Sequence, residues 1–322
     1  MKKIVVGIIM ASFVAVVGSS HAATVFKKNN FTYEIKGDWQ IQMRQDPGKD
    51  QDMDLEYDDL EIKNKVSYDI NDALSAFGEL DLGFKNAADE SNEDDADPHL
   101  EEAYLGFKIQ DVKLFFGKTD SAGDEFGVAA TYETIVADDC FDEFGAVDGD
   151  DLIGLSTKVG GMLNVYATYE IEAESEKSDH NGSFFDIYAD VELQGVTLGA
   201  AYQNLEPYGS NDDTTIWGVQ ASYDAEFAAF GADYSVTDDA DDSDETVWNL
   251  FVEVPVKPVT IAMGYVALDY DDGREDETVA GWYGNVTYKF PTAKNVSLFA
   301  EISDSDETDV DLGYLVGARL KF

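Results

Sequence analysis

The sequence has little basic charge and almost no cysteine. Lys and Arg number 21 against 67 Asp and Glu, so the formal charge at pH 7 is −46. A chain this acidic repels nucleic-acid phosphates and anionic lipid surfaces, which excludes nucleic acid as a partner. The one cysteine, Cys140, excludes a disulfide framework and a cysteine-based metal cluster.

Long apolar runs and catalytic side chains are also scarce. Beyond the first residues no stretch of about 18 apolar residues occurs, which excludes a helical membrane protein. Hydrophobic residues still make up 44% of the 322 residues, too many for a disordered chain. The histidines, His21, His99 and His180, lie in a leader or in expected loops, and Cys140 has no histidine near it. The sequence therefore predicts no enzyme.

The first 22 residues have the pattern of a secretory leader. Lys2 and Lys3 precede an apolar run over 4–17, and Ser20 and Ala22 occupy the −3 and −1 places of a cleavage site. A single membrane anchor would need a longer run and different flanks. We expect cleavage after Ala22, or one residue later, so that residues 23–322 form one domain that works outside the cytoplasm.

After the leader, apolar and polar residues alternate with period two, the pattern of strands with two different faces. Seven short connections that contain turn residues alternate along the chain with eight long, acidic ones, which predicts sixteen strands. An even number of antiparallel strands, with short turns at one end and long loops at the other, favours an outer-membrane β-barrel. A soluble β-sandwich or secreted β-repeat protein would also alternate, but with far fewer strands per domain.

Three segments carry a family resemblance. The last strand, 313–322, alternates and ends on Phe322; the segment 103–107 reads AYLGF and is followed at 115–118 by FFGK; and the longest connection, 119–150, lies between the fifth and sixth strands. In these features the chain resembles the general, trimeric diffusion porins of Gram-negative outer membranes. The aromatic residues Tyr33, Trp39 and others near strand ends fit the girdles of such a barrel.

The resemblance implies a fold, a location and partners. The fold is all-β, a 16-stranded antiparallel transmembrane barrel whose third loop, 119–150, folds into the barrel and narrows it. The protein is expected in the Gram-negative outer membrane, in contact with lipid and lipopolysaccharide, as a homotrimer. Phe322 is expected to be the signal that the barrel-assembly machinery reads.

Departures from the family pattern concern the wall that faces the third loop. Porins commonly carry arginines there, whereas Asp59, Glu101 and Gly154 stand at the matching positions of this chain. The expected pore-wall residues are Lys36, Asp38, Arg44, Asp59, Glu61, Lys63, Lys65, Lys85, Glu101 and Glu102. The expected constriction acids of the third loop are Asp120, Asp124, Glu125, Glu133, Asp138, Asp139, Asp142 and Glu143. Because a charged ring in a narrow pore selects ions by sign, we predict a cation-preferring diffusion pore for small hydrophilic solutes.

Other interpretations of the same features stay open. The acidic loops suit a surface adhesin, a receptor or a divalent-ion-binding barrel with little conductance. Runs such as 238–245 lack EF-hand spacing, so Ca²⁺ or Mg²⁺ is expected only as diffuse counterions, and no cofactor is predicted. A sugar-specific channel would use lumen aromatics, for which the candidates are Tyr104, Phe115, Tyr166, Tyr188 and Phe299.

Overall fold

A computed structural model describes most of the chain after the predicted leader. The described residues are 23–47, 51–84, 98–173, 181–210, 213–238, 244–271, 277–306 and 312–322. The predicted leader, 1–22, and the predicted wall residue Lys85 lie outside them.

Nearly all of the described elements are strands, and their order follows the chain. They are β1 (Ala23–Lys28), β2 (Phe31–Gln45), β3 (Asp54–Asn71), β4 (Leu74–Gly83), β5 (His99–Ile109), β6 (Val112–Asp120), β7 (Asp148–Val159), β8 (Leu163–Glu170), β9 (Ser183–Leu193), β10 (Val196–Glu206), β11 (Thr214–Asp224), β12 (Ala229–Asp238), β13 (Asp244–Val256), β14 (Val259–Asp271), β15 (Glu277–Phe290), β16 (Ala293–Ser305) and β17 (Gly313–Lys321). Two short helices, η2 (Gly123–Glu125) and α2 (Cys140–Glu143), lie between β6 and β7. Among the described residues, no helix is long and apolar enough to cross a membrane.

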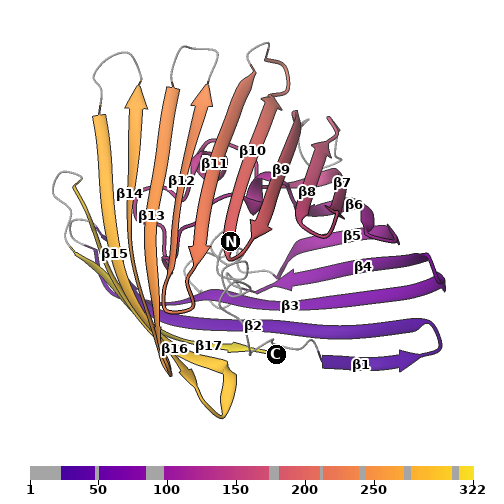
Figure 1. Ribbon diagram of the computed structural model, residues 1–322, viewed down its shortest axis with the longest axis horizontal. Coiled ribbons are helices and arrows are strands. Elements are labelled where there is room, and N and C mark those ends of the chain that lie inside the picture. The colour runs from indigo at the N-terminus through magenta and orange to yellow at the C-terminus, as the bar shows by residue number, and fades with distance from the viewer. Residues whose placement is uncertain are drawn as a thin grey trace.

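Sixteen of the described strands form a closed antiparallel ring. Each strand from β2 to β17 pairs with its chain neighbour, and β17 pairs back with β2, from Tyr314 opposite Gln45 to Lys321 opposite Asp38. In Figure 1 the colour therefore runs round the wall from indigo β2 to yellow β17. The ring confirms the predicted sixteen-stranded barrel.

The remaining strand, β1, was not predicted. It pairs with the first part of β2, with Ala23 opposite Ile35, on the same edge that β17 uses further along. The backbone of Phe322 exchanges two hydrogen bonds with Gly37, at 2.8 and 3.0 Å. Strand β1 therefore continues the line of β17 beside β2.

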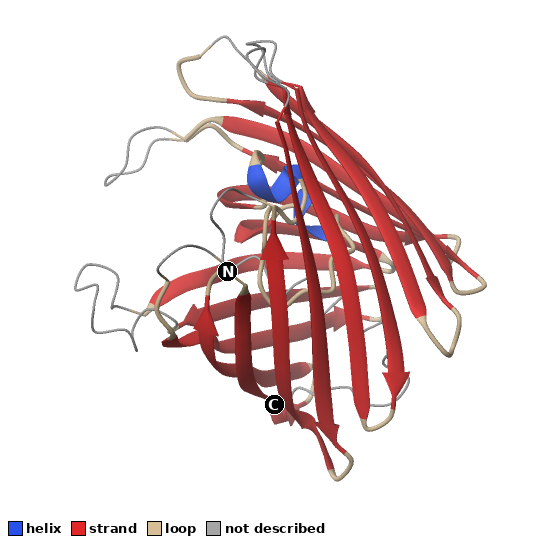
Figure 2. Ribbon diagram, turned by 90° about the vertical axis from the view of Figure 1, so that its left-hand side faces the viewer, coloured by secondary structure: helices blue, strands red, loops and turns tan. Residues whose placement is uncertain are grey.

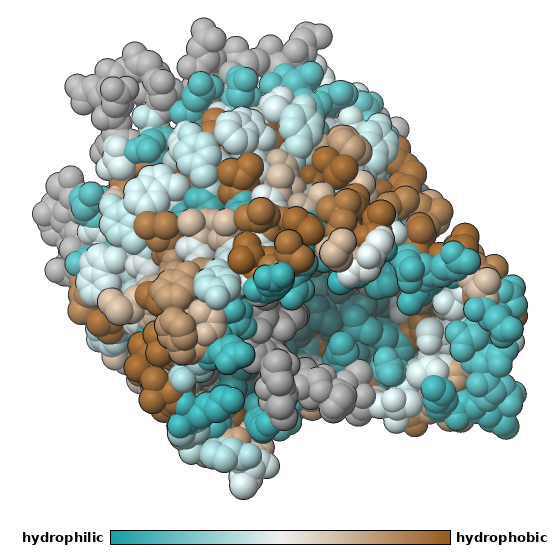
Figure 3. Space-filling view, in the orientation of Figure 1, coloured by the Kyte–Doolittle hydropathy of each residue, from teal (hydrophilic) through white to brown (hydrophobic). Residues whose placement is uncertain are grey.

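The wall has an apolar outer face and a mostly polar inner face, as the alternation predicts. Trp39 and Met43 of β2 are 47% and 49% exposed, whereas the intervening Gln40 and Gln42 are buried. Figure 3 shows brown and white residues over the outside of the wall and a hollow lined by teal ones. A face of exposed aliphatic and aromatic side chains is what lipid contact requires.

The short connections fall where turn residues predict them. Gln194 and Gly195 both have positive φ, at 54° and 80°, which is the backbone of a two-residue hairpin turn. Gly160 and Gly161 also have positive φ, at 62° and 74°. Glycine adopts this region without a steric penalty, so these turns need little else to form.

The segment between β6 and β7 contacts the inner face of the barrel. It is defined here as the inner segment, residues 121–147, and contains η2 and α2, which are blue in Figure 2. Phe126, Phe141 and Cys140 pack with inward residues such as Ile216 and Val247 in an apolar cluster. The alternation predicts a polar partner face along every strand, and this prediction is wrong where the inner segment covers the wall.

Candidate functional site: the inner face of the barrel

A group of ion pairs joins β17 to β2 and β3 across the closure of the ring. The Arg319 guanidinium donates to Asp38 at 2.8 Å and to Asp59 at 3.1 Å, and Lys321 Nζ lies 3.0 Å from Asp38. Both carboxylates are almost fully buried. Asp59 is thus held by an arginine from the last strand.

A second group of charges lies on β3, β4 and β5. Lys63 Nζ lies 2.8 Å from Asp81, 3.4 Å from Glu61 and 3.7 Å from Glu102. Lys65 pairs with Glu79, which also accepts a hydrogen bond from the Tyr104 hydroxyl. Lys63 therefore meets three carboxylates, and the group as a whole is negative.

The inner segment reaches across to β2 through Glu133. The Glu133 carboxylate accepts a hydrogen bond from Gln42 at 2.7 Å and pairs with Arg44 at 2.8 Å. Arg44 also pairs with Asp46 and Glu56. The arginine is again surrounded by more than one acid.

Side chains of many strands bind the inner segment. Its backbone amides donate to Thr168, Asp186, Gln203, Gln220, Asp233 and Ser235 and to the Tyr283 hydroxyl. Glu301 of β16 accepts from the Tyr132 amide at 2.8 Å and the Thr131 hydroxyl at 2.9 Å. The Tyr132 ring stacks on Phe299, with ring centroids 4.1 Å apart. Some of these residues, such as Phe299, were predicted to face the lumen, but their role as anchors of the inner segment was not predicted.

The predicted constriction acids fall into different environments. Asp139 is buried and caps α2, accepting from the Phe141 and Asp142 amides at 2.8 and 3.1 Å. Burial, then repulsion from Asp142 and Asp233, raises the pKa of Asp139 well above its usual range. Asp138 accepts from Thr134 within the segment, while Asp142 and Glu143 belong to α2.

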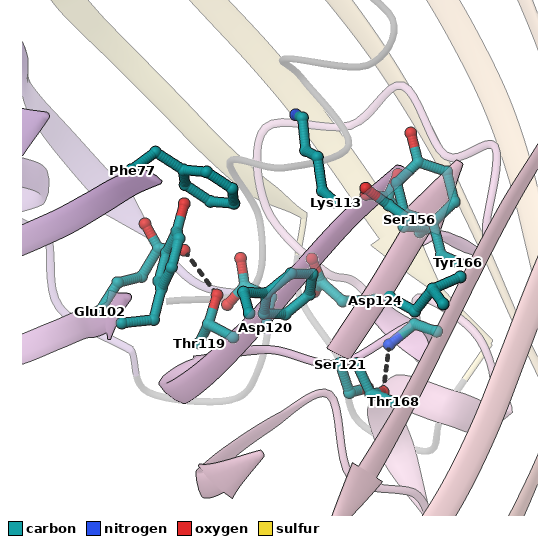
Figure 4. Close-up of a pocket in the computed structure, with 15 residues that line it drawn as sticks. Phe77, Glu102, Lys113, Thr119, Asp120, Ser121, Asp124, Ser156, Tyr166 and Thr168 are labelled. Carbon is teal, nitrogen blue, oxygen red and sulfur yellow. Dashed lines mark hydrogen bonds between the residues drawn. The ribbon is translucent and has the colours of Figure 1, made fainter. Parts of the chain in front are cut away.

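Three of the predicted acids share one cavity. Asp120, Asp124 and Glu125 line a space of about 180 Å³, together with Glu102, Lys113 and several aromatic rings. Figure 4 shows Asp120 and Asp124 between the side chains of β4–β6 on one side and β8 on the other. Burial raises the pKa of Glu125 to about 7 and that of Asp124 well above its usual range.

The remaining predicted wall residues lie apart from this cavity. Lys36 is on the inner face of β2, opposite Lys63 in the strand register. Glu101 pairs with His99 at 2.8 Å and lies at the register shift between Asp81 and Leu82, where no residue of β4 is directly opposite it. Among the described residues, no group of three or more His, Cys, Asp or Glu is arranged to hold a metal ion. Most of the acidic run 238–245 lies outside the described residues.

Comparison with known proteins decides the family. A family model described as Gram-negative porin matches residues 10–310. The chain belongs to the Gram-negative porins. Outer membrane porin protein OmpD of Salmonella typhimurium is 28% identical over 254 residues, which cover 78% of this porin and 62% of OmpD. This porin thus spans about three fifths of the OmpD relatives, whereas Porin-like protein H of Photobacterium profundum, 21% identical, matches over all of both chains.

Solved structures share the fold of this porin. OmpT of Vibrio cholerae, solved in a trimer form, has a TM-score of 0.74 at 16% identity and covers 91% of this chain and 100% of its own. An anion-selective porin from Comamonas acidovorans has a TM-score of 0.74 at 13% identity, with the same coverage. The family and the barrel place this porin in the Gram-negative outer membrane.

The thiol of Cys140 is expected to be unreactive in the folded porin. Cys140 is fully buried between the inner segment, to which it belongs, and the wall; its Sγ donates to the Glu245 carbonyl, and burial raises the pKa of the thiol. A maleimide should therefore leave the native protein in detergent unlabelled and label one site after SDS denaturation. Ser210→Cys, at an exposed position, is the positive control. Labelling of native Cys140 at the rate of the control contradicts this placement.

Proposed function

We propose that this porin is a passive diffusion channel for small hydrophilic solutes that prefers cations to anions. The observation that carries the proposal is the pairing of the inner-face bases. Lys63 meets three carboxylates and Arg44 meets three, Glu56, Asp46 and Glu133. The acids around these two bases outnumber them, so the field near each base is negative and favours cations.

The fold alone does not determine this sign. The anion-selective porin of Comamonas acidovorans shares the barrel at a TM-score of 0.74. The side chains are what differ, and at position 154 this chain has a glycine beside the Phe115 ring, which would have to move for an arginine to fit. A Cβ on Gly154 would lie 2.0 Å from the ring of Phe115, which fills that place.

The test is the reversal potential of the channel in a planar bilayer under a KCl gradient. A potential that favours K⁺ is expected, and Glu133→Gln together with Glu125→Gln should move it toward zero. The matched control is Glu206→Gln, an acid beside another cavity, near Pro207. Preference for Cl⁻ would overturn the cation assignment. Folded protein without conductance would favour the surface-binding alternative.

We further propose that the barrel forms a homotrimer and that the inner segment, as the third loop, narrows the pore. The trimer form of OmpT and the contacts of the inner segment with the inner face support these two statements. Single channels should then close in three equal steps. One-step closure of the whole current would contradict the trimer.

Cation preference is expected to weaken as the pH falls from about 8 to 6. The pKa of Glu125 is raised to about 7 by burial and by Asp190, against the opposing effect of Lys113. The pKa of Asp124 is raised by burial and then by Asp120, Asp142, Glu125 and Asp139. These two acids take up protons before ordinary carboxylates do, so the K⁺/Cl⁻ permeability ratio should fall about twofold in this range.

Protonation of Glu125 is expected to weaken cation preference but to stabilise the fold. Because the folded-state pKa of Glu125 lies above its unfolded value, folding takes up a proton between about pH 4.5 and 7, and stability rises as the pH falls through this window.

A Glu125→Gln channel should lose most of the change in permeability ratio. An unaltered pH profile in that variant would contradict the assignment of these protons.

Removal of the Phe322 ring is expected to impair assembly more than stability. The ring packs edge-on against Trp39, with centroids 5.8 Å apart, on the outer face beside Gly37. Phe322→Ser should cost about 1 kcal/mol in detergent refolding for the lost aromatic pair, in addition to the lost apolar contact of the half-buried ring. If the assembly machinery reads this residue, the yield of folded barrel in cells should fall several-fold. Equal yields of wild type and variant in cells would contradict that role.

A further inference from the structure

The cavity that holds Asp120, Asp124 and Glu125 also has aromatic walls. Phe77, Tyr104 and Phe115 come from β4, β5 and β6, and Tyr166 comes from β8. Figure 4 shows Phe77 and Tyr166 on opposite sides of Asp120. We propose that this cavity binds an organic cation, an ammonium group carried on a small aromatic body. The inference rests on the proposed channel function and names the solute class that lingers in the channel.

The carboxylate of Asp124 has no hydrogen-bond partner within the described part of the chain. Asp124 is 8% exposed, and within the described part of the chain no side chain or backbone amide donates a hydrogen bond to its carboxylate. Glu102 differs, because it accepts from Thr119 at 3.0 Å and lies 3.7 Å from Lys63. An unpaired buried carboxylate is costly, and a cationic ligand removes that cost.

The net charge of the lining favours a cation over an anion or a zwitterion. Among the lining residues, Glu102, Asp120, Asp124 and Glu125 are acids and Lys113 is a base, while Lys63 reaches Glu102 from outside the lining. The carboxylate of a zwitterion would therefore meet more acids than bases. A singly charged ammonium compound has no carboxylate, so the negative lining attracts it without any opposing repulsion.

The rings favour an organic cation over a hydrated metal ion. Tyr104 lies 6.3 Å from Phe77 at 78° and 5.7 Å from Phe115 at 52°, so several ring faces and edges border the space. Ring faces attract ammonium groups and also pack against the apolar body of an organic cation. A hydrated inorganic ion has no such apolar surface. The volume of about 180 Å³ suits one ring with a short chain, since a cavity of about 150 Å³ holds benzene.

The experiment is block of the K⁺ current of the intact channel by 2-phenylethylammonium, added at constant ionic strength. Neutral 2-phenylethanol and methylammonium are the comparison probes. We expect block by the aromatic amine at concentrations about tenfold lower than for methylammonium, and none by the alcohol. Equal block by the two amines would overturn the proposal and leave a site for charge alone.

Variants separate the two halves of the site. Asp124→Asn should weaken block by the aromatic amine about tenfold, and Glu125→Gln serves the same purpose if Asp124→Asn does not fold. Tyr166→Leu should weaken only the aromatic amine, with recovery in Tyr166→Phe. Glu206→Gln, beside the other cavity, should change nothing. Unchanged block in both acid variants would overturn the site.

Failure of this inference is distinguishable from failure of the channel function. The K⁺ preference is measured first, on the same channels and without amine. A cation-preferring channel that no amine blocks overturns the organic-cation site alone. A channel that prefers Cl⁻ overturns the proposed function.

Discussion

Replacement of Lys63 by methionine is expected to lower the free energy of unfolding by about 3–5 kcal/mol, the cost of removing one partner from a buried ionic group. Lys63 is the base that Asp81, Glu61 and Glu102 share, and Asp81 is completely buried. Without the ammonium, the three acids repel one another or must take up protons, and either outcome costs folding free energy. The measurement is reversible urea unfolding of the porin in detergent micelles.

A surface pair of the same barrel is the matched control. Lys118 pairs with Asp150 at 2.6 Å, but the Asp150 side chain is 73% exposed. Solvent screens such a pair, so Lys118→Met should change the free energy of unfolding by less than about 1 kcal/mol. Similar losses in Lys63→Met and Lys118→Met would show that burial does not set the value of the Lys63 group.

Replacement of Glu301 by alanine is expected to release the middle of the inner segment from the wall. Glu301 accepts from the Tyr132 amide, the Thr131 hydroxyl and the Glu133 amide, the last at 3.3 Å. Each buried donor left without an acceptor costs about 1–3 kcal/mol, so the bound arrangement loses several kcal/mol at one point. Single-channel recordings should show greater current noise and a conductance that rises by up to about twofold.

A second inner-face acid tests whether the anchor, rather than lost charge, produces this effect. Glu253 lies on β13, and within the described residues its carboxylate makes no hydrogen bond to the inner segment. Glu253→Ala removes the same charge and should leave the current noise unchanged. Equal noise in both variants would assign the effect to charge and contradict the anchoring role of Glu301.

The barrel itself could be predicted from the sequence because its cause is local. Alternation at period two, as at Trp39, Ile41 and Met43, follows directly from one lipid face and one inner face. Turn pairs such as Gln194-Gly195 mark the hairpins in the same local way. The ring then requires the first wall strand to pair with the last.

The site could be predicted only in part, because its contacts join distant positions. Asp59 was predicted to face the lumen, but its partner Arg319 is 260 residues away. A register shift at Gln40/Gln42 moves side chains of β3 off strict alternation, so both Asp58 and Asp59 come to be buried. Nothing local indicates that Glu133 meets Gln42 and Arg44, or that Glu301 holds the inner segment.

The aromatic residues illustrate the same limit. Tyr104, Phe115, Tyr166, Tyr188 and Phe299 were all predicted to face inward, without any order among them. The structure gathers Tyr104, Phe115 and Tyr166 around one cavity. Phe299 instead stacks on Tyr132 of the inner segment. Parity along a strand fixes the face of a residue but not its height in the barrel relative to other strands.

Because β1 continues the line of β17 beside β2, the strands could keep their places around the ring even if the chain began at a different strand. Phe322 is opposite Gly37 and Ala23 is opposite Ile35, so one strand position, about 7 Å of chain in all, separates these residues along β2. A single inserted residue, opposite Lys36, would therefore join them into one continuous strand. The barrel can then be opened between β10 and β11 instead, to give a circular permutant with every wall pairing kept. The seam between β17 and β2 would become an ordinary pair inside the chain, and the pair β10–β11 would take over the closure of the ring.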